Sequence, residues 1–156
     1  MNRFNNKIKQ ILESLEFDMS REEVREDGKK IADFDWDVAE NLTISEVIDL
    51  FYFDDPKNDP VAKYLRSLKL PKKFTYIWIQ LLRILSTQRG LGRGSEIINT
   101  LAMQYPSGTL MALSPGEISS GQNKSSHKNL MSFYKQNGFK IVKSNDGVEF
   151  AFRITS

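Results

Sequence analysis

The spacing of the hydrophobic positions changes near residue 73, and this change divides the chain into two parts. Before it, apolar residues recur every three or four positions, which is the period of an amphipathic helix. This spacing predicts helices at 4–17, 45–53 and 60–68. The sequence Ser20-Arg21-Glu22-Glu23 resembles the capped start of another helix. Residues 31–37 instead alternate apolar with acidic side chains, and this pattern predicts a half-exposed strand.

After residue 73 the pattern predicts strands and helices in alternation. The run 74–85 is long, aromatic and β-branched, as expected of a central strand. Further strands are predicted at 109–113, 139–143 and 148–154, and helices at 95–104 and 127–137. The turn residues Ser144-Asn145-Asp146-Gly147 make the last two strands a hairpin. A polar loop at 117–126 separates the second strand from the last helix.

The composition narrows the class of protein. The 156 residues are 40% hydrophobic and 27% charged, as in a soluble globular protein of one domain. There is no cysteine and a single histidine, so disulfides, thiolate chemistry and multi-histidine metal centres are excluded. No apolar run reaches membrane-spanning length, and the first residues do not resemble a signal peptide. We therefore expect a cytoplasmic protein with no membrane partner.

Charge is distributed unevenly along the chain. Residues 1–60 contain 8 basic and 16 acidic residues, whereas residues 61–156 contain 14 basic and 4 acidic residues. A basic C-terminal part suits a polyanionic ligand such as a nucleotide-based cofactor. An acidic N-terminal part would attract a cationic acceptor such as an amine. The two parts would equally attract one another as they pack.

The most informative motif is Arg89-Gly90-Leu91-Gly92-Arg93-Gly94, between the predicted central strand and the following helix. A glycine-rich turn lets several backbone N–H groups converge on one point, and the positive end of the helix lies there as well. Gly92 and Gly94 permit close approach of a pyrophosphate, while Arg89 and Arg93 add positive charge. An ordinary tight turn with solvated arginines is the alternative. The motif favours a phosphate-bearing ligand.

Two segments, in this order, resemble the GNAT superfamily of N-acetyltransferases. The first is Gln88-Arg89-Gly90-Leu91-Gly92-Arg93-Gly94, which is similar to the family's pyrophosphate loop. The second is Phe133-Tyr134-Lys135-Gln136-Asn137-Gly138-Phe139, which is similar to the end of its last helix. The resemblance covers residues 74–154, and it implies an α/β (α+β) fold with a mixed, mostly antiparallel central sheet flanked by helices.

The resemblance also implies the organisation, the activity and the ligand. Residues 1–156 would form a single acyltransferase domain, with an atypical helix-rich part at 1–70 and a coenzyme A-binding half at 71–156. The activity would be transfer of an acetyl group from acetyl-CoA to an amine that attacks the thioester directly. The residues implied for binding coenzyme A are Ile84, Leu85, Gln88, Arg89, Gly90, Leu91, Gly92, Arg93, Gly94, Ser95 and His127.

Tyr134 occupies the position of the family's general acid, which protonates the departing thiolate; a buried core aromatic is the alternative reading. His127 stands where many members have an asparagine, although a helix cap or surface residue is more common for a lone histidine. The family's glutamate base has no counterpart, since no Asp or Glu occurs between Ala62 and Ser95. Glu117, a water molecule or the acidic N-terminal part would have to supply the base.

The N-terminal part departs from the family pattern. A typical member opens with a strand, two helices and a long antiparallel hairpin before the central strand. Only residues 69–73 separate the predicted helix 60–68 from the central strand, too few for that hairpin. We therefore expect either a sheet with fewer strands or one whose edge is covered by the helix 4–17.

Several functions remain open at this point. The acceptor would be a protein or peptide amine or a small cationic amine, to which the acidic and aromatic run 33–37 is suited. A non-catalytic acyl-CoA-binding module is the first alternative, favoured by the missing glutamate and opposed by Tyr134. An enzyme acting on a DNA base or on aminoacyl-tRNA is the second and is not favoured, because the N-terminal part is acidic and aromatic residues are not interleaved with the basic cluster in a stacking pattern. The cluster that could contact phosphates is Lys63, Arg66, Lys69, Lys72 and Lys73. Family members often dimerise, so a homodimer is possible.

Overall fold

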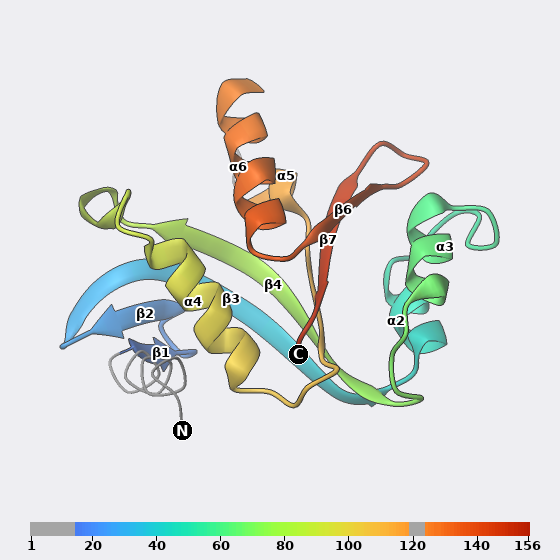
Figure 1. Ribbon diagram of the computed structural model, residues 1–156, viewed down its shortest axis with the longest axis horizontal. Coiled ribbons are helices and arrows are strands. Elements are labelled where there is room, and N and C mark those ends of the chain that lie inside the picture. Colours follow the sequence, from blue (N-terminus) through green and yellow to red (C-terminus); the bar gives the residue numbers. More distant parts are fainter. Residues whose placement is uncertain (1–14, 119–123) are drawn as a thin grey trace.

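The computed structural model describes residues 15–118 and 124–156. These residues form a seven-stranded sheet that runs through the molecule (Figure 1). The strands lie in the order β1-β2-β3-β4-β5-β7-β6. Their bounds are β1 Leu15–Asp18, β2 Glu23–Glu26, β3 Lys29–Leu42, β4 Phe74–Ile84, β5 Leu110–Leu113, β6 Lys140–Lys143 and β7 Glu149–Ile154. The helices are α2 Ile44–Leu50, α3 Pro60–Ser67, α4 Arg93–Met103, α5 Pro115–Ile118 and α6 Lys124–Gln136, with a 3₁₀ turn η1 at Ser86–Gln88.

The sheet is mixed and mostly antiparallel, as predicted. Strands β4 and β5 run parallel, and every other neighbouring pair is antiparallel. The helix α4 connects the parallel pair, because parallel neighbours need a crossover connection. The predicted elements after residue 73 are all present, with boundaries shifted by up to three residues. Among the described residues, no helix combines the length and the apolar character needed to cross a bilayer.

The prediction of a helix-rich N-terminal part is wrong, because three antiparallel strands precede α2. Leu15 and Phe17 alternate with acidic residues, and Leu15 and Val24 are buried in the core. Alternation of this kind buries one face of a strand against the sheet. Asp27 and Gly28 take positive φ angles and close the β2–β3 hairpin. Residues 15–17 are thus strand rather than helix, residues 20–23 do not start a helix, and residues 4–14 lie outside the described part.

Of the two alternatives for the sheet, the one with fewer strands is wrong, and the one with a covering helix at 4–17 falls mostly on residues outside the described part. The strand predicted at 31–37 is the middle of β3, which runs from Lys29 to Leu42 and pairs with β4 over most of its length. The two helices that the family pattern places after the first strand instead connect β3 to β4. The strands that precede these helices in the chain are therefore β1 and β2, which the sequence analysis did not find, and β3, of which it found the middle.

Each face of the sheet carries its own hydrophobic core. Helices α4 and α6 cover one face with residues such as Ile97, Leu101 and Tyr134. Helices α2 and α3 cover the other with residues such as Val47 and Leu65. In Figure 1, α4 crosses β3 and β4, α6 stands beside the β6–β7 hairpin, and α2 and α3 lie together.

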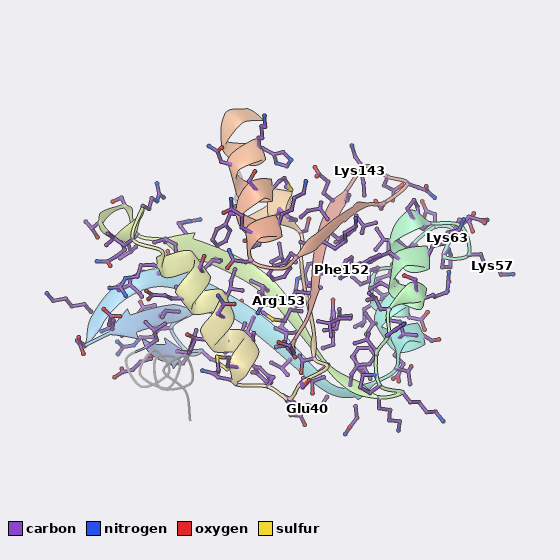
Figure 2. The ribbon with its side chains drawn as sticks, viewed as in Figure 1. Glu40, Lys57, Lys63, Lys143, Phe152 and Arg153 are labelled. Atoms are coloured by element: carbon purple, nitrogen blue, oxygen red, sulfur yellow. The ribbon has the colours of Figure 1, made fainter. Side chains whose placement is uncertain are left out.

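Two neighbouring residues of β7, Phe152 and Arg153, contact opposite faces of the sheet, and both are labelled in Figure 2. Phe152 is buried in the core beneath α2 and α3. Arg153 donates hydrogen bonds to the Asn99 side chain of α4 and to the Asn137 carbonyl after α6. Strand β7 thus ties the α4–α6 layer to the sheet, because side chains alternate between the faces of a strand.

Asp59 fastens α3 to the β6–β7 turn. It is 3% exposed, and its carboxylate accepts hydrogen bonds from the N–H of Val61 (2.8 Å) and of Asn145 (3.1 Å). We expect Asp59→Ala to lower the free energy of unfolding by about 2–4 kcal/mol, because a helix cap is lost and two N–H donors lose their partner. Urea unfolding measures this. The exposed cap Thr43 of α2 is the control, and an equal loss for Thr43→Ala would contradict the proposed tie.

Candidate functional site

Strands β4 and β5 pair over a short length and then separate. Their register joins Tyr76 with Leu110, Ile77 with Met111 and Trp78 with Ala112. Beyond this point Gln80 is an extra residue in β4, since Trp36 of β3 lies opposite Ile79 and Asp35 opposite Leu81. Such a β-bulge bends its strand and increases the local twist. Strand β4 continues along β3 to Ile84, whereas β5 ends at Leu113, so no described strand pairs with this side of β4 beyond Trp78; we call the space beside this unpaired edge the gap.

Backbone groups of β4 face this gap. The Leu85 N–H donates to the Ile31 carbonyl (3.0 Å), and the Leu85 carbonyl accepts from the Gln88 N–H (2.8 Å). Because backbone groups alternate along an antiparallel pair, the N–H groups of Leu82 and Ile84 are directed away from β3, towards the gap. Of the two backbone positions implied by the family resemblance, Ile84 therefore faces the gap and Leu85 faces β3.

The glycine-rich turn follows directly and leads into α4. Gly90 and Gly92 have φ angles of 77° and 74°, a region that L-residues disfavour. Gly92 caps α4 without a side-chain hydrogen bond, and the first helical bond runs from the Glu96 N–H to the Gly92 carbonyl. The N–H groups of the first helical residues, Arg93, Gly94 and Ser95, thus precede any intrahelical bond. This arrangement suits an anion.

Gly94 joins the two sequence motifs. A Cβ atom at this position would lie 2.8 Å from Cζ of Phe133, which belongs to α6. The absence of a side chain lets α6 approach the first turn of α4. The sequence indicated a role for Gly94 in phosphate approach, and the contact with Phe133 gives it a packing role.

The two arginines of the turn differ in their partners. Arg93 contacts both carboxylate oxygens of Glu26 at 2.7 Å and one of Glu96 at 3.0 Å, and its Nε donates to Gln88. The hydrogen bonds to Glu26, and then to Glu96, raise the pKa of Arg93. Arg89 is exposed and donates to the Ile84 carbonyl, and no described carboxylate pairs with it. Unneutralised positive charge in the turn therefore comes from Arg89.

Tyr134 lies within the core on the α4 face. It is 1% exposed, and its ring lies 5.1 Å from that of Phe133 and 5.5 Å from that of Phe139. Burial raises the pKa of Tyr134 well above its usual range. No described residue forms a hydrogen bond with its hydroxyl group. The phenol therefore stays protonated at neutral pH, as a proton donor must.

The buried tyrosines predict a loss of stability at alkaline pH. Burial raises the pKa of Tyr76 and of Tyr134, so both are more acidic in the unfolded chain. Their contribution to the free energy of unfolding is complete below pH 10. Above pH 10 it falls by up to about 1.4 kcal/mol per pH unit for each tyrosine. Urea unfolding between pH 8 and 11 measures the slope. The Tyr76→Phe/Tyr134→Phe variant should lose less stability over this range. If the slope of unfolding free energy against pH is the same in the variant, the loss is not due to these two tyrosines.

The other predicted residues lie elsewhere. His127, on α6, has its Nε2 atom 3.0 Å from a Glu149 carboxylate oxygen of β7, and its side chain is 43% exposed. Its described partner is thus on β7 rather than in the glycine turn. Glu117 belongs to the short helix α5 after β5, and its side chain lies outside the described part. Leu91 is exposed at the tip of the turn.

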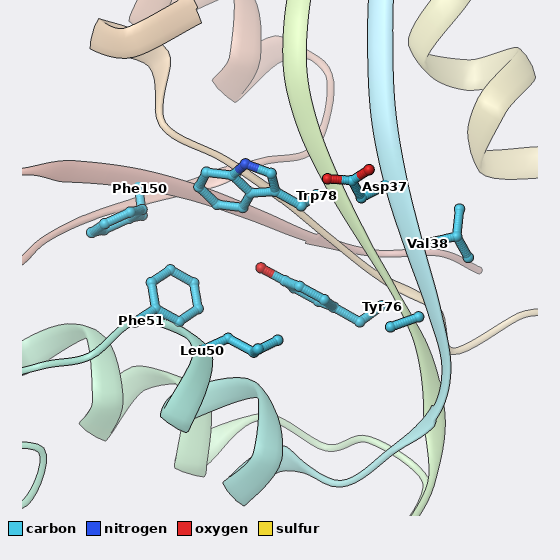
Figure 3. A pocket seen from close by; sticks show the side chains of 8 residues that line it. Asp37, Val38, Leu50, Phe51, Tyr76, Trp78 and Phe150 are labelled. Atoms are coloured by element: carbon cyan, nitrogen blue, oxygen red, sulfur yellow. The ribbon is translucent and has the colours of Figure 1, made fainter. Parts of the chain in front are cut away.

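The opposite face of the sheet holds a pocket of about 450 Å³ (Figure 3). Its walls come from four elements and are mainly aromatic and aliphatic, with a single carboxylate. They are formed by Asp37, Val38, Ala39, Leu50, Phe51, Tyr76, Trp78 and Phe150. The sequence marked the acidic run 33–37 and the polar face of β4 separately. It gave no sign that Leu50, Phe51 and Phe150 would join them, because their elements are far apart in the chain.

Comparison with solved structures finds similar folds. One is an acetyltransferase of the GNAT family from Streptococcus agalactiae. The match covers 97% of this chain and 72% of the acetyltransferase chain, with 16% sequence identity and a TM-score of 0.49. A structure described as histone acetyltransferase HPA2 and related acetyltransferase, from Corynebacterium glutamicum, matches 100% and 78%, with 12% identity and a TM-score of 0.46. Naa20 from Chaetomium thermophilum, in complex with a bisubstrate analogue, matches 99% and 74%, with 12% identity and a TM-score of 0.43. No family model and no curated protein sequence matches the chain.

Proposed function

We propose that the protein is a GNAT-type N-acetyltransferase that transfers the acetyl group of acetyl-CoA to an amine. The observation that carries the proposal is the gap between β4 and β5, which opens beside the glycine turn at the start of α4. The gap offers backbone groups to an extended ligand, and the turn offers N–H groups to its phosphates. The two motifs that resemble the family lie on the expected elements and contact each other through Gly94 and Phe133.

The residues of the turn fit a pyrophosphate. Gly90 and Gly92 hold the left-handed backbone of the turn, and apart from their neighbours in the chain no atom of the described residues lies within 4 Å of a Cβ built on either of them. The first turn of α4 adds backbone donors without a competing side-chain cap. Arg89 adds an exposed positive charge, whereas Arg93 is already neutralised by Glu26 and Glu96. The fit thus depends mainly on the backbone and on Arg89.

A few groups of this chain would each contribute to one step of acetyl transfer. Acetyl-CoA supplies, when bound, an acetyl group activated as a thioester. The Leu82 and Ile84 N–H groups can stabilise negative charge on a carbonyl oxygen placed in the gap, because they are directed there. Tyr134 holds a proton for a departing sulfur atom, since burial keeps its phenol protonated. Positioning of the amine supplies the remaining acceleration.

The proposal is tested with the purified protein in two steps. Calorimetry with coenzyme A measures binding, and carbonyl-labelled acetyl-CoA is then incubated with a cell extract separated into protein, nucleic-acid and small-molecule fractions. Label in the protein or small-molecule fraction supports an N-acetyltransferase and identifies the acceptor class. Label in nucleic acid favours the enzyme on a DNA base or aminoacyl-tRNA. Binding without label in any fraction favours a non-catalytic acyl-CoA-binding module, and no binding rejects all three.

A further inference from the structure

The aromatic pocket contains a hydroxyl group for which no described residue is a partner. Tyr76 is 6% exposed, and its hydroxyl group points into the pocket between Phe51 and Trp78 (Figure 3). No described residue forms a hydrogen bond with this hydroxyl. Because this hydroxyl opens onto the pocket, it is free to form a hydrogen bond with a polar group of a bound ligand.

The pocket walls suit a cation with an apolar body. The Phe51 ring meets those of Trp78 and Phe150 edge to face, with centroids 6.0 and 5.0 Å apart. Aromatic faces attract ammonium groups and also pack against apolar groups. Asp37, the one charged residue of the lining, accepts a hydrogen bond from Gln80 and lies beside Trp78 in Figure 3. A single carboxylate within an aromatic wall favours one ammonium group over a polycation.

The pocket lies at the start of the gap between the strands. Trp78 is the last residue of β4 that pairs with β5, and the strands separate directly after it. Trp78 packs with the layer formed by α2 and α3, whereas α4 and the glycine turn lie on the other face. A group held in the gap from the α4 face can therefore be met by a group held in this pocket from the opposite face.

We propose that this pocket binds a primary amine bearing an aromatic or bulky apolar group, with Asp37, Trp78 and the Tyr76 hydroxyl around its nitrogen. Its volume suits a small molecule. The proposal that this amine is the acetyl acceptor rests on the proposed function. The bound ammonium group first gives one proton to Asp37 or to water, and the lone pair freed on nitrogen then bonds to the acetyl carbon as the carbon–sulfur bond breaks. The sulfur leaves with the electron pair of that bond and takes a proton, and the nitrogen loses its second proton to water.

Tryptophan fluorescence tests binding without any coenzyme. The chain has two tryptophans, and Trp36 is buried in the other core, so Trp36→Phe makes Trp78 the sole reporter. We expect saturable quenching by phenethylamine, and about fivefold weaker binding of 2-phenylethanol and of butylamine, which lack the charge and the ring respectively. Asp37→Asn should remove the preference for the amine, and Tyr76→Phe should weaken binding. Asp35→Asn, on the same strand but outside the pocket lining, should leave binding unchanged.

The outcomes separate this inference from the proposed function. Absence of saturable quenching, or quenching unaffected by Asp37→Asn, overturns the pocket assignment. Binding that occurs without acetyl transfer to phenethylamine leaves the amine pocket in place and overturns its role as acceptor site. Transfer to other amines that is insensitive to Asp37→Asn and Tyr76→Phe leaves the acetyltransferase in place and overturns the pocket. Binding of peptide amines alone, with none of phenethylamine, overturns the assignment to small molecules.

Discussion

Replacing Tyr134 with Phe should lower kcat for acetyl transfer by about 10²- to 10⁴-fold, the usual contribution of a positioned general acid. The affinity for coenzyme A should change by less than about twofold, because the ring and its contacts with Phe133 and Phe139 remain. The physical reason is that burial keeps the phenol protonated and therefore able to donate. Steady-state kinetics with a saturating amine and calorimetry with coenzyme A measure the two quantities.

The matched control is Tyr64→Phe, on α3 in the other core, whose tyrosine pKa is also raised by burial. It should leave kcat unchanged. In the wild-type protein, Tyr134 should not cause a fall in kcat below pH 10, because its raised pKa keeps it protonated there. Full turnover by Tyr134→Phe would exclude Tyr134 as the proton donor and leave it as a core residue.

Gly92→Ala should lower the affinity for coenzyme A at least tenfold. An alanine fits the space, since no described atom other than those of its chain neighbours lies within 4 Å of its Cβ, but φ of 74° strains an L-residue by about 1–2 kcal/mol. The turn then relaxes away from the geometry in which its N–H groups converge. Calorimetry measures the affinity, and urea unfolding measures the accompanying loss of stability.

Gly147→Ala is the control for this substitution. Gly147 has φ of 84°, has only the end of the Lys143 side chain near its Cβ position, and lies in the β6–β7 turn, for which no hydrogen bond or ion pair with the glycine turn is found among the described residues. Both variants should lose a similar amount of stability, and only Gly92→Ala should lose affinity. An equal loss of affinity in both variants would show that general destabilisation, rather than the shape of the turn, accounts for the effect.

Local patterns predicted the second half of the fold well. Strand β4, helix α4 and the β6–β7 hairpin follow from β-branched runs, helical spacing and turn residues, and each depends on short stretches of sequence. The positive φ angles of Gly90 and Gly92 agree with a turn that only glycine forms easily. The bulge at Gln80, in contrast, lies directly beyond the last pair of β4 with β5, and no local pattern marked it.

The N-terminal strands show why local spacing was insufficient there. Leu15 fits both a helical spacing and the strand β1, and a run of four residues is too short to distinguish the two periods. The choice is made by pairing with β2, which itself pairs with β3. Contacts across a sheet give no signal within a single strand, so the helical spacing alone gave the wrong prediction.

The glycine turn, the place of Tyr134 near the end of the last helix and the strand-helix order after residue 73 all follow from local sequence, because backbone preferences and nearby residues set them. Three other features became visible only in the folded molecule: the ion pair of Arg93 with Glu26, the packing of Phe133 against Gly94, and the aromatic pocket formed by four elements. These arrangements join residues that are far apart in the chain. Their energies depend on the geometry of packing, which composition and spacing do not encode residue by residue.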